Sequence, residues 1–356
     1  GNHSLFQLLN HTTSKNGKKR LADLMISSFD LIASQSRASA VVELARKGEF
    51  LDAMEAVGLA FQKEEKPTES WIHWLEEKEE TSILNSILGF LGPIGGITIL
   101  ILVLLDILPT AFIGLWVLIG VGFLSRVFHS LKKAADSIPA ASTLKSYGLR
   151  ARQIENEAFF STVLLEEKAL FTRSQQSASN QLNELDRLGL WAQNRLNLLY
   201  IPINLLFWTD FLLFGRLTTW KNKVGTSLSH LPENLEKWEV WVSLGAFEQK
   251  LEGSAEVIRT EEIMLKANEI SHPLLDPAIA IANSIDFDST TRLVILTGAN
   301  MSGKTTFMRT LGINCVLANL GLSPFGTSLT LGPIQLYTSM RNSDNLGESV
   351  SSFYAE

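Results

Sequence analysis

Cysteine is almost absent from this chain, which has one in 356 residues, at Cys315. A lone cysteine cannot form a disulfide within the chain, which fits a reducing compartment. Because Cys315 lies in an apolar stretch that we expect to be helical, we predict a buried structural thiol. The first residues also lack the apolar core of a signal peptide, so we expect them to stay in the mature protein.

An excess of positive charge is also lacking. The chain has 31 Lys and Arg against 37 Asp and Glu, a formal net charge of −6. This balance provides no chain-wide basic surface for the phosphates of a nucleic acid. A short basic run, Lys15 to Arg20, is predicted to form a solvated helix face, with contact to DNA phosphates as the alternative.

Charge of either sign is missing from two long apolar stretches. Residues 81–105 and 107–125 are 25 and 19 residues without a formal charge, separated only by Asp106. A helix of roughly 20 residues crosses a hydrocarbon core of about 30 Å. With Asp106 and Pro109 in the connecting turn, the pattern predicts a transmembrane helical hairpin. A buried helix pair in a soluble core is the alternative.

The flanks of this hairpin carry positive charge and the connecting turn carries none. Lys78 precedes the first stretch, and Arg126, Lys132 and Lys133 follow the second. By the positive-inside rule both large flanks lie in the cytoplasm. Trp71 and Trp74, just before the hairpin, are predicted near the membrane interface.

A third apolar stretch, residues 196–215, contains Pro202, Asn204 and Asp210. These polar and helix-breaking residues favour a buried core helix over a third membrane span. Residues 1–60 and 148–189 have apolar side chains at helical spacing, which predicts packed helices.

The pattern changes after about residue 256. Ile285 and Phe287 alternate with polar residues, a polar turn covers residues 288–292, and the run 293–296 is predicted to be a buried strand. An α/β unit is therefore expected in this part of the chain.

The strongest motif is GANMSGKT at Gly298 to Thr305, which matches the phosphate-binding pattern G-x-x-x-x-G-K-[ST] between a predicted strand and a predicted helix. Gly298 and Gly303 let backbone amides turn toward phosphate oxygens at the helix N-terminus. Lys304 is predicted to neutralise the β and γ phosphates, and the Thr305 hydroxyl to hold Mg²⁺. The predicted nucleotide-binding residues are Gly298, Ala299, Asn300, Met301, Ser302, Gly303, Lys304, Thr305 and Thr306.

A second buried strand ending in Asp-Glu, which such ATPases use to position metal and water, is not found in the sequence. We expect that the chain ends before that strand and that this fragment does not hydrolyse nucleotide. The catalytic residues are therefore unknown at this stage.

The residues around the loop, TGANMSGKTTFMRT at 297–310, closely resemble the MutS family of DNA mismatch-repair ATPases. SHPLLD at 271–276 and Asn283 resemble the family's entry to its ATPase domain. His272, which precedes a proline there, is expected to cap a turn or to pack, with catalysis as the alternative. DNLGESVSSFYAE at 344–356 resembles a segment in which a serine, here Ser351, reaches the nucleotide of a partner subunit. SLFQLLNHTTSKNGKKRLADLM at 4–25 is similar to the start of the family's helical core.

The sequence departs from the family pattern at several positions. Asn345 and Ser349 replace a common Asp and Gly, and Ala280 stands where an aromatic residue often lies beside adenine. With a membrane hairpin inside its helical core, the chain most resembles a membrane-associated branch of MutS-like bacterial proteins.

The resemblance implies a homodimer formed through the ATPase domain, ATP and Mg²⁺ as cofactors, and DNA as a partner that the net charge does not support. It also implies the bacterial inner membrane, contacted through residues 81–125, with the ATPase and helical parts in the cytoplasm. The function expected is an ATP-driven conformational switch, in which ATP binds one conformation more tightly than the other. An ABC-like transport ATPase component or a non-catalytic nucleotide-sensing scaffold are the alternatives.

The predicted fold is multidomain: a mostly α-helical core with a two-helix transmembrane hairpin, followed by a partial α/β P-loop NTPase domain. The predicted boundaries are 1–80 for the first part of the helical core, 81–128 for the hairpin, 129–255 for further core and lever helices, and 256–356 for the ATPase domain.

Overall fold

The computed structural model describes residues 4–62, 69–79, 82–172, 177–251, 255–276, 278–291, 293–299 and 302–338. The chain separates into two compact units. The first comprises Gly1–Met25, Ser36–Glu252 and Leu320–Leu322, and the second comprises Ile26–Gln35, Gly253–Asn319 and Ser323–Glu356.

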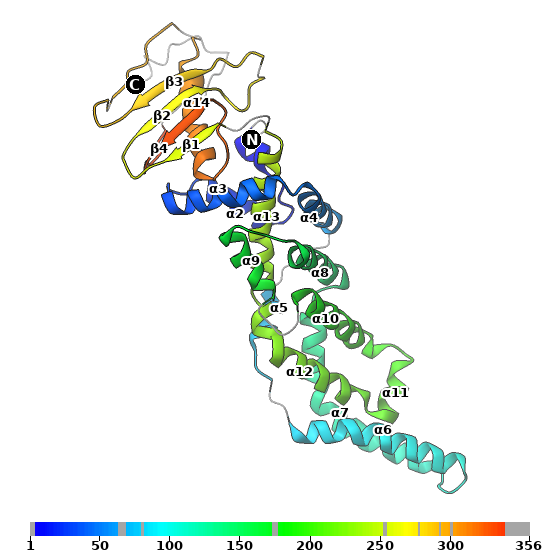
Figure 1. Cartoon of the computed structure of the whole chain (residues 1–356). Coiled ribbons are helices and arrows are strands. Elements are labelled where there is room, and N and C mark those ends of the chain that lie inside the picture. The colour runs from blue at the N-terminus through cyan, green and yellow to red at the C-terminus, as the bar shows by residue number, and fades with distance from the viewer. Residues whose placement is uncertain are drawn as a thin grey trace, which may run out of the picture. The chain divides into compact units, whose positions relative to one another are not determined.

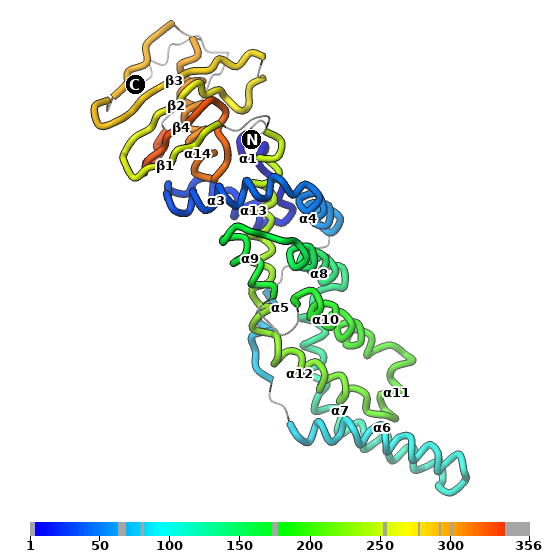
Figure 2. Tube along the Cα trace, in the orientation of Figure 1, coloured from blue at the N-terminus to red at the C-terminus, as the bar shows by residue number. Residues whose placement is uncertain are grey.

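The first unit is helical throughout its described residues (Figures 1 and 2). Its helices are α1 (Leu5–Leu9), α2 (Lys15–Met25), α3 (Leu31–Ala45, whose first residues belong to the second unit), α4 (Gly48–Phe61), α5 (Glu69–Glu76), α6 (Ile83–Leu104), α7 (Ala111–Ser137), α8 (Ala141–Asn156), α9 (Thr162–Thr172), α10 (Ala178–Gln193), the 3-10 turn η1 (Asn194–Leu196), α11 (Tyr200–Phe207), α12 (Thr209–Leu228) and α13 (Leu231–Gln249). The mostly helical character predicted for this part of the chain is therefore confirmed.

Helices α6 and α7 form an antiparallel pair joined by a short turn (Figure 1). Asp106 in the turn has a φ of 55°, a left-handed conformation that Asp tolerates better than most residues. Both helices are long and apolar enough to cross a membrane by length and composition. Most of their surface lies open, since only 22% and 17% of their most apolar windows are buried.

The third apolar stretch forms two helices instead of the single buried helix that we predicted. The chain breaks at Trp208, whose φ of 51° is left-handed, so α11 ends and α12 begins there. Helix α12 buries its apolar residues, but Leu198 and Leu199 before α11 are 83% and 77% exposed. Pro202 did not reveal the break at Trp208, because the first turn of a helix tolerates a proline.

Aromatic side chains fill the core of the helical unit. Trp71 and Trp74 of α5 are 0% and 1% exposed, so the protein itself covers both rings, and their level relative to a membrane stays a prediction. Trp74 stacks on Trp220 of α12 and Trp71 lies beside Tyr147 of α8. Burying rings of this size is among the largest single contributions to a core, which explains why α5 is drawn into it.

One buried ion pair connects α8 and α13. Arg150 Nη1 donates to Glu239 Oε1 at 2.8 Å, and both side chains are more than nine-tenths buried. The same carboxylate accepts hydrogen bonds from Thr13 Oγ1, at 3.0 Å, and from the backbone and hydroxyl of Ser14. Glu239 thereby ties the entry to α2 to the middle of the helical unit.

The described residues of the second unit form a mixed four-stranded sheet with helix α14 (Lys304–Asn319) against it. Its strands are β1 (Glu256–Arg259), β2 (Leu265–Ile270), β3 (Asn283–Phe287) and β4 (Ser328–Leu331), in the order β1-β4-β2-β3. Strand β4 pairs parallel with β1 and antiparallel with β2, and β3 pairs antiparallel with β2. Helix α14 packs on the sheet through Cys315 and Ala318.

Cys315 is buried in this small core, as predicted. Burial raises the pKa of its thiol to about 12. The thiol therefore stays protonated near neutral pH and lacks the thiolate needed for nucleophilic chemistry.

Candidate phosphate-binding site

The glycine-rich loop lies immediately before α14, which begins at Lys304. Gly303 has a φ of 89°, a conformation that strongly favours glycine, and no other described part of the chain lies near the position of a Cβ there. The requirement for glycine at this position is therefore conformational and not steric. Of the predicted binding residues, Asn300 and Met301 lie outside the described residues.

The Lys304 ammonium folds back onto the loop. Its Nζ donates to the carbonyl oxygens of Gly298, at 2.8 Å, and Ala299, at 2.5 Å, and lies 3.3 Å from the Ser302 hydroxyl. These contacts hold a positive charge over the loop, at the end of α14 where the helix dipole is also positive. The arrangement concentrates positive potential at one point on the surface of the second unit.

The first turn of α14 leaves backbone donors in front of this charge. The amide of Phe307 makes the first hydrogen bond to the turn, to the Gly303 carbonyl at 2.9 Å, so the amides of residues 304–306 precede the helical ladder. Thr305 and Thr306 are exposed at the same end of the helix. Amide donors, a hydroxyl and an ammonium together form a donor set suited to an anion.

Asn314 anchors the helix behind the loop, and the sequence reasoning missed it. Its side chain, 0% exposed, donates to the carbonyls of Ser271, at 3.0 Å, and Thr310, and accepts from the Phe325 amide at 2.7 Å. Asn314 thereby connects α14 to two loops distant in sequence. A buried-looking Asn within an apolar helix was the signal that could have revealed it.

His272 adopts the capping role that was predicted for it. Its Nδ1 accepts a hydrogen bond from the Leu274 amide at 3.2 Å, within the turn that leads out of β2. Burial, with a smaller contribution from the nearby Arg309 cation, lowers the pKa of the imidazole. A neutral ring is what this role requires, because the accepting nitrogen must be free of a proton.

The run Leu293 to Leu296, predicted as a buried strand, is not part of the sheet. Leu293 and Ile295 are 77% and 75% exposed, and no described residue pairs with the run in a ladder. A strand is buried only when neighbouring strands complete its hydrogen bonds and cover its faces. The described sheet offers neither to this run, so the prediction fails on tertiary pairing although the residue pattern is that of a strand.

The remaining motif residues cannot be placed. Ser351, together with Asn345 and Ser349, lies outside the described residues. Among the described residues, no group of three or more His, Cys, Asp or Glu side chains is arranged to hold a metal ion. Thr305 is thus the one predicted metal contact that the described part of the chain presents.

Comparison with known proteins identifies the class of domain that carries the loop. Residues 294–356 match the family model of MutS domain V. The chain is also 32% identical over 134 residues to the DNA mismatch repair protein MutS of Desulfovibrio desulfuricans. The segment that carries the loop is therefore similar to MutS domain V.

The two findings support membership of this chain in the MutS family. The aligned region covers 36% of this chain and 14% of the Desulfovibrio protein, so the comparison bears on one portion of a much longer relative.

Proposed function

We propose that this protein is an ATP-binding member of the MutS family that acts as an ATP-driven conformational switch. The observation that carries the proposal is the set of donor groups at the start of α14, the Lys304 ammonium and the first helix amides, within the region that matches MutS domain V. A glycine-rich loop with a lysine at the start of a helix is the feature that P-loop ATPases use for phosphates.

The residues of the loop fit the phosphates of a nucleotide with magnesium. The amides at the start of α14 would bind phosphate oxygens, and Lys304 would exchange the carbonyls of Gly298 and Ala299 for the β and γ phosphates. The Thr305 hydroxyl, which is exposed, would be a ligand of Mg²⁺. When bound, Mg-ATP supplies the free energy that separates two conformations, provided that it binds one of them more tightly.

Two copies of the chain would meet at their ATPase domains. This part of the proposal rests on the resemblance at residues 344–356, in which Ser351 corresponds to a serine that reaches the partner's nucleotide. Replacing Ser351 with Ala should then lower hydrolysis by the dimer while leaving nucleotide binding by each subunit unchanged.

Helices α6 and α7 would anchor the protein in the bacterial inner membrane. Their exposed surface includes Phe90 and Leu118, which are 71% and 72% exposed. The core helices of soluble proteins bury most such side chains, whereas helices in lipid leave them open. The cations of Lys78, Arg126 and Lys132 would keep both flanks in the cytoplasm.

DNA as a partner is supported by family membership and by the printed name of the Desulfovibrio relative, a mismatch repair protein. We propose that nucleotide-driven movement of the helical unit acts on DNA. ATP hydrolysis by the full-length protein in detergent, with and without homoduplex, mismatched and branched DNA, tests this part. No stimulation and no binding with any DNA would contradict it.

The Lys304→Ala variant tests the nucleotide site directly. Removing the ammonium that lies over the loop should abolish binding of a fluorescent ATP analogue, because nothing else in the described loop carries positive charge. Lys266→Ala is the matched control, since Lys266 lies on β2 in the same unit and pairs only loosely with Asp286 at 3.7 Å. If Lys304→Ala and Lys266→Ala bind ATP equally well, the assignment of the site is wrong.

A further inference from the structure

The chain between η1 and α12 exposes apolar side chains that the nucleotide site does not explain. Leu196, Leu198 and Leu199 are 74%, 83% and 77% exposed, and Ile201 and Ile203 of α11 are also exposed. No charged residue occurs between Arg195 and Asp210. We call residues 196–208 the α11 segment.

The α11 segment packs directly on α6 and α7. Trp116 Nε1 of α7 donates to the Leu206 carbonyl at 2.8 Å, and the Trp116 ring stacks on Trp208 with centroids 4.3 Å apart. A Cβ at Gly96 of α6 would collide with the Leu206 carbonyl, so this glycine permits the close approach. The exposed apolar surface of the segment is therefore continuous with that of the two helices.

The depth of the segment follows from its neighbours on α7. Arg195, at its start, has its guanidinium 5.5 Å from the centroid of the Phe128 ring, close to Arg126 where the uncharged run ends. Trp116 lies ten residues before Arg126, or about 15 Å along the helix at 1.5 Å per residue. The segment thus begins level with the charged end of α7 and reaches inward along its apolar part.

The polar groups in the deeper part of the segment are turned toward its interior, whereas Asn197 at its start is exposed. Asn204 Oδ1 accepts from Thr209 Oγ1, at 3.1 Å, and from the Asp210 amide, at 2.8 Å. Asp210, 2% exposed, is paired with Arg195 and accepts from the Tyr200 hydroxyl at 2.9 Å. Polar and ionised groups that lie at membrane depth must be satisfied within the protein in this way.

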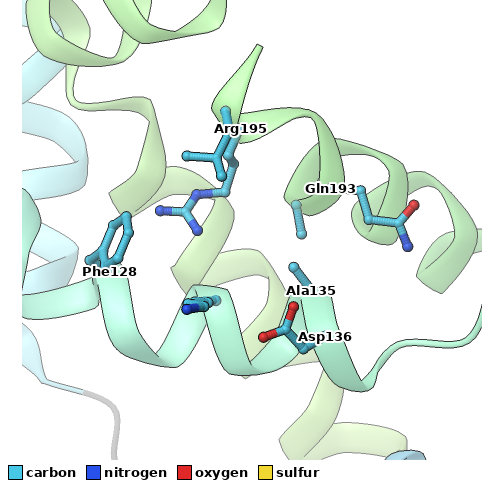
Figure 3. Close-up of a pocket in the computed structure, with 8 residues that line it drawn as sticks. Phe128, Ala135, Asp136, Gln193 and Arg195 are labelled. Atoms are coloured by element: carbon cyan, nitrogen blue, oxygen red, sulfur yellow. The ribbon is translucent and has the colours of Figure 1, made fainter.

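A cavity of about 290 Å³, lined by both charged and apolar side chains, marks the base of the segment (Figure 3). Arg195 of η1 and Gln193 of α10 line it from one side, and Ala135 and Asp136 of α7 line it from the other. Lys132 also lines it. The α11 segment begins among charged side chains and continues with apolar ones. A membrane changes in the same order, from polar headgroups to acyl chains.

We propose that the α11 segment is embedded in the bilayer as a re-entrant element that enters and leaves on the cytoplasmic side, with lipid acyl chains covering its exposed face. The inference rests on the proposed membrane insertion of α6 and α7. Helix α11 has eight residues, about 12 Å of helix, and cannot cross a core of about 30 Å. The irregular turn at 197–199 lies at the level of Phe128 and Arg126, where headgroups and water satisfy free backbone groups.

The test places an environment-sensitive NBD label on single cysteines of the full chain and reconstitutes the protein in vesicles with nitroxide-labelled acyl chains. Leu199→Cys and Ile203→Cys report on the α11 segment, and Leu118→Cys reports on the hairpin. Phe160→Cys is the control for a label in water, because Phe160 is 82% exposed on the connection before α9. Native Cys315 is buried, so the unsubstituted chain should take up no label under the same conditions. We expect the nitroxide lipids to quench the labels at 199, 203 and 118 and to spare the label at 160.

The outcomes separate this inference from the proposed function. Quenching at 118 without quenching at 199 and 203 overturns the re-entrant segment and leaves the hairpin anchor intact. If the label at 118 also escapes quenching, the membrane anchor itself is wrong. A label at 199 that is shielded from aqueous iodide but unquenched by lipid would show that a second copy covers the segment, which also overturns the inference.

Discussion

At the scale of single residues, the loop shows how closely residue type and position are linked. Gly303 is required by a φ of 89°, and Lys304 is the first residue of α14, where an ammonium and helix amides face the same side. Both features follow from the motif alone, because the chemistry of phosphate binding allows few substitutes. The contacts of Lys304 with two carbonyls were not predictable, since they depend on how the backbone of the loop closes.

The role of His272 could be predicted from the sequence, whereas the role of Asn314 could not. His272 was predicted to cap a turn because a histidine before a proline commonly does so, and its Nδ1 accepts the Leu274 amide. Asn314 escaped notice because its partners, Ser271 and Phe325, are distant in sequence. A buried amide side chain can be understood only when all the groups that it satisfies are known.

Replacing the partly buried Glu167 of α9 with Gln is expected to stabilise the protein in a pH-dependent way. Burial is the main reason that its pKa is raised, and its Oε2 meets no donor among the described residues. The pKa of Glu167 is higher in the folded than in the unfolded state. Its contribution to the free energy of unfolding is therefore fully present below the unfolded-state pKa and is lost as pH rises through the folded-state pKa. Glu167→Gln should therefore unfold at higher urea concentration than the wild type at pH 7, and the advantage should vanish near pH 4.

Glu166→Gln is the control for this measurement. Glu166 is the exposed neighbour on the same helix, so its replacement should change stability by no more than about 0.5 kcal/mol at either pH. A Glu167→Gln variant whose advantage over the wild type is the same at pH 4 and pH 7 would refute the explanation by burial of charge.

At the scale of elements, helix boundaries follow local chemistry where the local signal is unopposed. The turn at Asp106 and Pro109 separates α6 from α7 as predicted, because a charge and a proline both oppose continuation of an apolar helix. Trp208 breaks the next apolar stretch at a position that neither Pro202 nor Asp210 marks, in a left-handed conformation supported by its stacking on Trp116. Tertiary packing supplies the free energy for that break, and no local pattern contains it.

The pairing of α8 with α13 through Arg150 and Glu239 predicts a large loss of stability on truncation. Glu239→Ala removes the carboxylate that compensates a buried guanidinium and that accepts from Thr13 and Ser14. The cost of leaving such a charge uncompensated is about 3–5 kcal/mol. Urea unfolding followed by far-ultraviolet circular dichroism should show a correspondingly lower midpoint for the helical unit.

Lys237→Ala provides the comparison on the same helix. Lys237 and Glu233 are an exposed pair one turn apart, 4.0 Å between charged atoms, and such pairs contribute about 0.3–0.5 kcal/mol. Equal losses for Glu239→Ala and Lys237→Ala would mean that the buried network does not hold the two helices together.

At the scale of the whole molecule, the proposed membrane anchor predicts which side of the membrane each exposed loop faces. Thr110, exposed in the turn between α6 and α7, should face the periplasm, whereas Phe160 should face the cytoplasm. In intact cells a membrane-impermeant maleimide should modify Thr110→Cys and should modify Phe160→Cys only after permeabilisation. Each variant serves as the other's control for expression and reactivity. Modification of Phe160→Cys alone in intact cells would reverse the orientation, and modification of both would exclude a membrane-spanning hairpin.

The sequence by itself determined the features that depend on local chemistry and on composition. These are the loop at 298–305, the helical character of the first part of the chain, the two apolar helices, the turn between them and the resemblance to the MutS family. Each depends on residues that are close together in the chain, or on the cost of placing a charge or a proline at a given position.

Only the tertiary structure decided which apolar residues are covered. Trp71 and Trp74 lie in the core because α8 and α12 offer them rings and space, and Leu293 to Leu296 remain exposed because the described sheet offers them no partner. The α11 segment is exposed although it resembles a core helix in composition. The physical reason is common to all three, since burial depends on surfaces contributed by distant parts of the chain, which an apolar pattern does not specify.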